Sequence, residues 1–365
     1  MRVLQLIDSL TLAGAEVLVK EVAPRLRNRG IDCEVAVLRR LQSPLELSLQ
    51  DAGVQLHSTG VKRLYSPRQV RPLTKLMREF ELVHVHLFPA QLWAVLGNIR
   101  LRNPVPLVTT EHGTANFRRR WWLRSFDAWL YRHYVSIACN SMATAKSLIR
   151  WCPSTEPKVH VIPNGIPLND FEDAQPAAVA VPSKDIRLVC VGRFEPPKDH
   201  ATVLRALTTI PNVQLLLVGD GILRPSLEKL ARSLGVAERV TFFGRRKDVA
   251  QILKASDIYI HSATFDGFGI AACEAMAAGL PVIASDVPGL ADVVRGAGIL
   301  FPVGDHAALA REIRELLVSS ERRRELSEAS QKRAQSFGID RTVDGYLAMY
   351  ESVLHAKRAI NGVLQ

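Results

Sequence analysis

A chain of 365 residues, 47% apolar and 23% charged, has the size and composition of a soluble globular protein with two domains of about 180 residues each. Its net charge of +11 is uneven: residues 1–170 contain 23 basic and 13 acidic side chains, whereas the remainder contains 24 and 23. The basic first half predicts contact with an anionic surface.

Several protein classes are excluded by the sequence. No uncharged apolar run reaches the roughly 18 residues needed to cross a bilayer. The apolar opening segment ends at Asp8 without a cleavage motif, so it is expected to be a strand and not a signal peptide. The five cysteines are scattered and have no metal-ligand spacing, which indicates free thiols in a reducing cytoplasm.

The first half alternates strand-like and helix-like segments, the pattern of a parallel sheet covered by helices. A strand over residues 3–7 leads through a turn containing Gly14 into a helix that ends before Gly30, and a second strand covers 31–38. This order is also found in dehydrogenases, but the G-x-G-x-x-G fingerprint is missing here. An α/β fold is therefore predicted without a dinucleotide site.

Histidines lie near the ends of two later strands. His84 and His86 lie on one face of the strand 82–86, and His112 follows the strand that starts at residue 106. A metal pair at His84 and His86 has no third ligand nearby, so a position at the strand tip facing an interdomain cleft is favoured. His112 lies at the carboxyl end of its strand, where open α/β sheets bind ligands.

Residues 117–134 read FRRRWWLRSFDAWLYRHY, with five arginines interleaved among aromatic side chains. Basic groups with interfacial aromatics suit a helix that lies on anionic lipid headgroups. An ordinary helix packed on its sheet with a solvated basic face is the main alternative. A nucleic-acid patch is disfavoured because no nucleic-acid-binding fold accompanies the segment. We expect residues 118–132 to contact a membrane surface.

The second half begins after a Pro- and Ala-rich stretch, 167–184, that is expected to be an exposed linker. A strand over 187–191 then leads into a proline-stiffened turn with Arg193 and Lys198 on either side. A planar guanidinium and an ammonium at this spacing suit a diphosphate, although exposed charge at a turn would explain them equally well.

The most informative stretch is 261–286, HSATFDGFGIAACEAMAAGLPVIASD. A strand, a Gly-rich turn and a helix with small first-turn residues form an anion site, because free N–H groups and the helix dipole point at the same place. Asp266 and Glu274 are eight residues apart in this stretch. Glu274 has only neighbours that are expected to be buried, and a buried carboxylate needs a partner, for which ligand hydroxyls are suitable.

This stretch resembles the signature of the retaining nucleotide-sugar glycosyltransferases of the two-domain GT-B fold, family 4. The resemblance covers Asp266-Gly267-Phe268-Gly269 and Glu274-Ala275-Met276-Ala277-Ala278-Gly279-Leu280-Pro281-Val282. The first acid of the signature is usually Glu, so Asp266 shortens its reach by one methylene. Weaker matches occur at Gly14, at the strand end with His112, at Arg193 and Lys198, and at Gly244, which in the family lies beside the nucleotide base.

The resemblance implies two Rossmann-like domains facing a deep cleft: an acceptor-side domain over 1–166, a nucleotide-sugar domain over 185–338, and a terminal helix over 339–365 that packs back on the first. It implies that Arg193 and Lys198 hold the donor diphosphate, that Glu274 holds ribose hydroxyls, that Asp266 holds the transferred sugar, and that His112 faces sugar or acceptor. The residues expected to bind substrate are Gly14, Arg193, Lys198, Gly244, Asp266, Gly267, Phe268, Gly269, Ile270 and Glu274, and the expected catalytic set is His112, Asp266, Arg193 and Lys198.

The expected reaction is transfer of a hexose-type sugar from a UDP-sugar to a glycan or lipid-linked acceptor, without a metal cofactor, by a cytoplasmic enzyme peripheral on the inner membrane face. Two alternatives remain: a GT-B nucleotide-sugar epimerase, and a non-catalytic nucleotide-sugar-binding subunit at the membrane. A phosphorylase is disfavoured because it would need a lysine-bound cofactor and a far longer chain. The donor sugar, the acceptor and the linkage are not specified by these residues.

Overall fold

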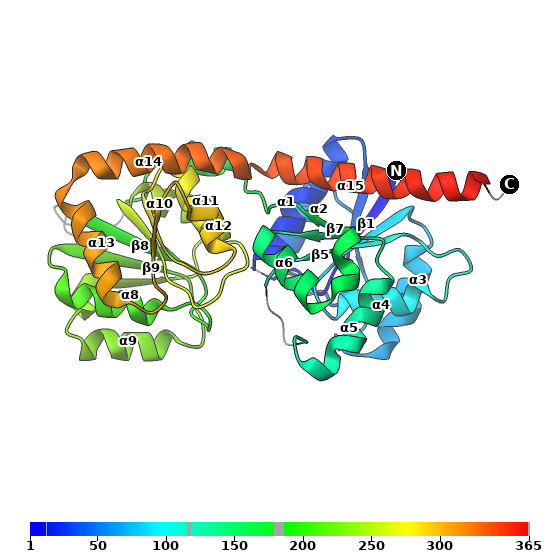
Figure 1. Ribbon diagram of the computed structural model, residues 1–365, viewed down its shortest axis with the longest axis horizontal. Helices are drawn as coiled ribbons and strands as arrows, with labels where there is room; N and C mark the ends of the chain where they lie inside the picture. Colours follow the sequence, from blue (N-terminus) through cyan, green and yellow to red (C-terminus); the bar gives the residue numbers. More distant parts are fainter. Residues whose placement is uncertain (12, 115–117, 179–185, 364–365) are drawn as a thin grey trace. The chain divides into compact units, whose positions relative to one another are not determined.

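The computed structural model describes residues 1–11, 13–114, 118–178 and 186–363 and divides into two compact units (Figure 1). The first unit contains residues 1–165 and 339–365, and the second contains residues 166–338. Each unit has a parallel sheet covered by helices on both faces, so the chain is an α/β protein with two Rossmann-like units.

The first unit has a sheet with the strand order β3-β2-β1-β4-β5-β6-β7. The strands are β1 Arg2–Ile7, β2 Asp32–Val37, β3 Leu56–Ser58, β4 Leu82–His86, β5 Leu107–Glu111, β6 Ser136–Cys139 and β7 Val159–Val161. The helices are α1 Gly14–Asn28, α2 Pro44–Asp51, α3 Val70–Met77, α4 Ala90–Asn98, α5 Arg124–Arg132, α6 Met142–Trp151 and α15 Ile339–Val363.

The second unit has a sheet with the strand order β10-β9-β8-β11-β12-β13. The strands are β8 Ile186–Val191, β9 Val213–Val218, β10 Val240–Gly244, β11 Ile258–His261, β12 Val282–Ser285 and β13 Ile299–Phe301. The helices are α7 Leu168–Glu172, α8 His200–Ala206, α9 Arg224–Ser233, α10 Val249–Lys254, α11 Ile270–Ala277, α12 Leu290–Val294, α13 His306–Val318 and α14 Ser320–Ala334.

The strands of both sheets are nearly continuous apolar runs because helices cover both of their faces. All six residues of β9 are buried, for example. In each sheet the strand order reverses once, between β1 and β4 in the first unit and between β8 and β11 in the second. Ligands of open α/β sheets bind outside the carboxyl ends of the strands at this switch point. Functional side chains are therefore expected at the two switch points.

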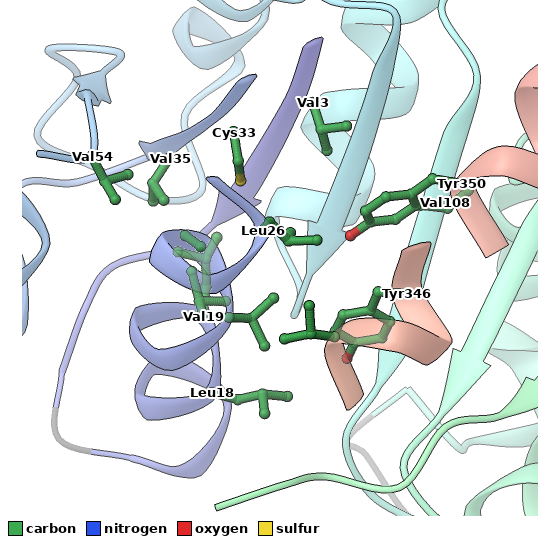
Figure 2. Close-up of a cluster of buried hydrophobic side chains, with 14 of the residues drawn as sticks. Val3, Leu18, Val19, Leu26, Cys33, Val35, Val54, Val108, Tyr346 and Tyr350 are labelled. Carbon is green, nitrogen blue, oxygen red and sulfur yellow. The ribbon is translucent and has the colours of Figure 1, made fainter. Parts of the chain in front are cut away.

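The terminal helix α15 completes the core of the first unit. Tyr346 and Tyr350 are fully buried and point from α15 toward the sheet, close to Val108 of β5 and the apolar face of α1 (Figure 2). The two rings stack with their centroids 6.3 Å apart. The first unit thus needs residues from both ends of the chain to fill one core.

Residues 167–184, which were expected to be an exposed linker, begin with structure. Helix α7 occupies part of this stretch, and its Phe171 is buried in a core cluster of the second unit with Phe337. Residues 179–184 of the expected linker lie outside the described part of the chain. The expectation of an exposed linker is therefore wrong at Phe171, because burial of this apolar ring in the cluster is favourable.

Candidate active site

The switch point of the second sheet brings the loops after β8 and β11 together. The backbone of residues 197–199 pairs with that of residues 262–264: the Asp199 amide donates to the Ser262 carbonyl at 3.0 Å, and the Thr264 amide donates to the Pro197 carbonyl at 2.9 Å. This pairing places Lys198 beside the end of β11. The charged turn and the signature stretch, which are far apart in sequence, therefore share one edge of the sheet.

Lys198, His261 and Asp266 form a compact polar cluster there. The Lys198 Nζ lies 2.5 Å from Asp266 Oδ2 and 2.6 Å from His261 Nε2, and the Tyr259 hydroxyl lies 3.2 Å from His261 Nδ1. Burial lowers the pKa of His261, and the charge of Lys198 lowers it further. His261 Nε2 also lies 3.0 Å from Asp266 Oδ2, so this nitrogen faces both the ammonium and the carboxylate. With His261 and Asp266 as its two side-chain partners among the described residues, the Lys198 ammonium keeps one of its three N–H groups for a ligand.

Asp266 is ionised in this cluster. Burial alone would raise the pKa of Asp266, but the charge of Lys198 and the hydrogen bonds with His261 and Lys198 together outweigh burial and hold the pKa well below its usual range. Oδ2 accepts from Lys198 and Oδ1 accepts from the Phe268 amide at 3.1 Å. Oδ2 also lies 3.0 Å from His261 Nε2, whereas Oδ1 keeps a lone pair that could accept from a sugar hydroxyl. The part played by His261 was not predicted, although its place at the end of a strand beside the signature was an available signal.

Helix α11 begins at this cluster. Its N-cap, Gly269, has φ of +92°, and a Cβ there would lie 2.5 Å from Leu290 Cδ1, so only glycine fits. The Gly269 carbonyl accepts the Ala272 and Cys273 amides, and no side chain caps the helix. The amides of Ile270 and Ala271 in the first turn are left for an anion. The Phe268 side chain is buried, and its ring lies edge-on to that of Phe337.

Glu274 lies one helical turn beyond Ile270 on the same side of α11. Among the residues that the structure describes, none forms a hydrogen bond with its carboxylate. Burial raises its pKa to about 7. An acid held in this state without a protein partner is suited to accept hydrogen bonds from ligand hydroxyls.

Arg193 is separate from the cluster. Its side chain is 63% exposed and pairs with Glu195, with Nη1 2.8 Å from Oε2. The two cations predicted to act together therefore pair with different carboxylates: Arg193 pairs with Glu195, and Lys198 pairs with Asp266. An exposed ion pair of this kind is worth little and breaks readily, so Arg193 is free to turn to an anionic ligand.

Gly244 ends β10 at the same edge of the sheet. It has φ of +66°, and its carbonyl accepts the Gly219 amide at 2.9 Å. A Cβ on Gly219 would lie 1.9 Å from the Gly192 carbonyl oxygen. These glycines allow the loops after β8, β9 and β10 to approach within backbone contact.

In the first unit, Gly14 is the exposed first residue of α1, and the N-cap Ala13 makes no side-chain hydrogen bond. Nearby, Asp8 follows β1 and accepts the Ala90 amide at 2.8 Å. Burial raises the pKa of Asp8 to about 7, and the charge of Glu16 adds to this rise.

His112 follows β5 and joins a buried network that contains His84 and His86. His112 Nε2 lies 3.1 Å from His86 Nδ1, and His84 Nδ1 lies 2.6 Å from the Tyr350 hydroxyl. His84 and His86 are almost fully buried and hydrogen-bonded inside the first unit. The four ring nitrogens of this pair contact Tyr350, Thr110, His112 and Gln5, all inside the first unit. Their position facing an interdomain cleft stays a prediction.

The segment 118–132 was predicted to form an exposed basic surface, but only some of its side chains are exposed. Arg118 is buried, with Nε 2.7 Å from Asp127 Oδ1 and its guanidinium 4.5 Å from the Phe88 ring centroid. By contrast, Trp121 and Trp122 are 81% and 55% exposed at the start of α5. Arg118 was wrongly expected to contact a membrane, since its charge is neutralised inside the unit.

Among the described residues, no group of three or more His, Cys, Asp or Glu side chains could hold a metal ion. Within the same residues, no helix combines the length and apolarity needed to cross a membrane.

The chain matches two family models, "Glycosyl transferases group 1" over residues 171–333 and "Glycosyltransferase Family 4" over residues 12–170. It is 31% identical to the D-inositol 3-phosphate glycosyltransferase of Mycolicibacterium smegmatis, covering 95% of this chain and 88% of the relative. It is 28% identical to the lipopolysaccharide core biosynthesis glycosyltransferase LpsE of Rhizobium meliloti, covering 61% and 66%. A crystal structure of Anabaena Alr3699/HepE in complex with UDP-glucose is similar in fold, with a TM-score of 0.84, 21% identity and coverage of 96% and 100%.

Proposed function

Because this chain belongs to the glycosyl transferases group 1 and has the GT-B fold, we propose that it moves a hexose-type sugar from a UDP-sugar to a glycan or lipid-linked acceptor with retention of anomeric configuration. The main support for this proposal is the charged cluster at the switch point of the second unit. Lys198 and the first-turn amides of α11 supply positive potential, and Glu274 supplies a carboxylate that none of the described residues hydrogen-bonds.

The proposed chemistry is electrostatic. The bond between the sugar C1 and the diphosphate oxygen breaks, and its electron pair leaves with the nucleotide diphosphate. The acceptor hydroxyl oxygen bonds to C1 on the same face, and its proton passes to the departing phosphate oxygen. Lys198, Arg193 and the amides of α11 stabilise the charge that grows on the diphosphate, which is the interaction that accelerates such a step.

The other residues position the donor. Glu274 accepts hydrogen bonds from the ribose hydroxyls, and Asp266 accepts one from the transferred sugar with its remaining lone pair. His112 contributes to the sugar or acceptor side from the first unit. Gly244 and Gly14 allow close approach of backbone to the base and to phosphate or sugar, respectively.

We further propose that no metal is needed, because Lys198 and Arg193 supply the positive charge that a divalent ion would otherwise provide. Turnover that persists in excess chelator supports this proposal. Turnover that disappears in chelator and returns with Mg²⁺ or Mn²⁺ contradicts it.

Calorimetric titration of UDP- and GDP-sugars into the wild type and Glu274→Ala tests the donor site. We expect one UDP-sugar to bind, and Glu274→Ala to weaken that binding about tenfold or more, since it removes charge-assisted hydrogen bonds. Glu325→Ala, an exposed carboxylate on α14, is the matched control. Proton NMR of the product then reports its anomeric configuration. Binding of no nucleotide sugar, or an inverted product, would contradict the proposal.

We also propose that the acceptor is presented at an anionic membrane. This proposal rests on the exposed Trp121 and Trp122, on Arg120, which lies 5.4 Å over the Trp122 ring, and on the exposed Arg124. Interfacial tryptophan beside arginine suits a lipid headgroup layer. Flotation with vesicles containing phosphatidylglycerol is expected to recover the wild type and to lose the double variant Trp121→Ala/Trp122→Ala. Tyr65→Ala removes a comparably exposed aromatic from the same unit and serves as the control.

A further inference from the structure

A buried hydrogen-bond network joins three strands of the first unit to α15. It has two arms that meet at the Tyr350 hydroxyl, which lies 2.8 Å from Gln5 Nε2 and 2.6 Å from His84 Nδ1. One arm runs from Gln5 through His86 to His112. Figure 2 shows Tyr350 and Tyr346 pointing from α15 toward the sheet that carries this network.

The arm through Gln5 has a direction. The Gln5 Oε1 lies 2.8 Å from His86 Nε2, and a carbonyl oxygen can only accept, so His86 carries its hydrogen on Nε2. Burial lowers the pKa of His86 well below its usual range, and the ring is neutral. Its Nδ1 is therefore bare and accepts from His112 Nε2–H at 3.1 Å.

A second observation supports the same direction. Nδ1 of His112 is buried, and no described residue forms a hydrogen bond with it. Reversing every hydrogen bond along the arm, with the Gln5 amide turned around, would place an N–H at this nitrogen. A buried N–H without an acceptor is rarer in proteins than an acceptor without a donor. The two observations agree that His112 carries its hydrogen on Nε2 and has a bare Nδ1.

We propose that Gln5 is a positioning residue that acts through His86 to hold His112 as the Nε2–H tautomer, so that His112 accepts a hydrogen bond from a hydroxyl of the donor sugar. This proposal rests on the proposed function for its ligand. His112 follows the carboxyl end of β5, the edge of the sheet where ligands bind. Nδ1 is covered here, so the contact forms on binding, as hydrogen bonds at unliganded sites often do.

The tautomer has a consequence for donor choice. A bare nitrogen accepts from a sugar hydroxyl but offers no hydrogen to a carboxylate. A sugar carrying a carboxylate at this position would place an anion against a lone pair. His112 therefore favours neutral hexosyl donors over hexuronyl donors, and Gln5 maintains this preference without touching the sugar.

Long-range ¹H–¹⁵N correlation spectra of the full chain labelled on histidine test the tautomer directly. His112 is assigned by the signals missing in His112→Asn. We expect Nδ1 of His112 to resonate as a bare nitrogen and Nε2 as a protonated one. A protonated Nδ1 in the wild type overturns the proposal.

Two variants test the role of Gln5. Gln5→Met keeps the side-chain length but removes the oxygen that orients His86, so His112 is expected to populate both tautomers. The turnover number with UDP-glucose should then fall about tenfold, with a smaller change in KM. Tyr346→Phe is the matched control, because it removes a buried hydroxyl from the other arm, 3.2 Å from Thr110 Oγ1, and leaves Gln5 unchanged. A single, unchanged tautomer in Gln5→Met contradicts the proposed role.

The ligand contact is tested separately with saturating UDP-glucose and UDP-glucuronate. We expect UDP-glucose to shift the Nδ1 resonance toward that of a hydrogen-bonded nitrogen and UDP-glucuronate to leave it unchanged. An unmoved Nδ1 while calorimetry shows bound UDP-glucose refutes the sugar contact. Failure of every UDP-sugar to bind counts against the proposed function, whereas the tautomer measurement needs no sugar.

Discussion

The ligand edges of the two sheets have the same topology but different chemistry. In the second unit the switch point carries an ion pair, Lys198 with Asp266, and the carboxylate of Glu274, which has no hydrogen-bond partner among the described residues. In the first unit the switch point between β1 and β4 carries a network of neutral rings, an amide and hydroxyls that includes His86. The two sheets thus share a topology, and their side chains give one edge charged groups and the other neutral hydrogen-bonding groups.

Where the first unit does bury an ion pair, the pair is structural. Arg118 and Asp127 are almost fully buried, and the carboxylate also accepts from Trp151 Nε1 at 2.8 Å. The pair of Lys198 and Asp266 differs, because it lies beside the first turn of α11, where the donor is proposed to bind. Three predictions follow this contrast from the largest expected effect to the smallest.

Arg118→Met should destabilise the first unit by about 3–5 kcal/mol, because it leaves the Asp127 carboxylate buried without its charge partner. Urea unfolding followed by circular dichroism gives the shift in midpoint. The matched control is Arg120→Met, an exposed arginine two residues away, which should change the free energy of unfolding by less than about 0.5 kcal/mol. Equal effects of the two substitutions would remove the distinction between structural and surface charge.

Lys198→Ala should lower kcat/KM by about 10²–10³-fold, since it removes the charge closest to the departing diphosphate. Lys229→Ala, an exposed lysine on α9 of the same unit, is the control and should leave turnover unchanged. If Lys198→Ala kept turnover within about threefold of the wild type, Lys198 would have only a structural role, as Arg118 does, and the contrast between the two ion pairs would be lost.

Donor affinity should depend on pH through Glu274. Its pKa of about 7 means that the carboxylate is ionised above pH 7 and protonated below it, so binding that requires the ionised form weakens as pH falls through 7. Because one group titrates, Kd should rise by at most about tenfold for each pH unit below 7. Calorimetry of the wild type from pH 5.5 to 8.5 measures the slope, and Glu274→Gln should bind weakly at every pH with a flat profile. A wild-type profile as flat as that of the variant would assign Glu274 a structural role.

Much of each unit was predictable because local signals agreed with the global fold. Buried parallel strands read as apolar runs, and β4 was predicted with its observed bounds. The turn with Lys198 and the stretch with Asp266 were recognised separately from charge, glycine and helix patterns. Their contact follows from strand order, since loops after neighbouring strands at a switch point must meet.

The rest depended on long-range contacts that have no local signal. Arg118 lies in a run of arginines that looks solvated, and only the fold shows that Asp127 and Phe88 enclose it. His84 meets Tyr350, which is 266 residues later in the chain. Local sequence patterns report periodicity and secondary-structure propensity. They carry no information on which distant hydroxyl forms a hydrogen bond with a buried histidine ring.

Helix α15 also bears on how the protein is made. Residues 1–165 emerge from the ribosome first, but their core still lacks Val343, Tyr346, Met349 and Tyr350 until the last segment has been synthesised. The second unit, residues 166–338, is continuous and can finish folding earlier. The first unit therefore begins to emerge before the second but can complete its core only after α15 has emerged, so its sheet stays unfinished for longer.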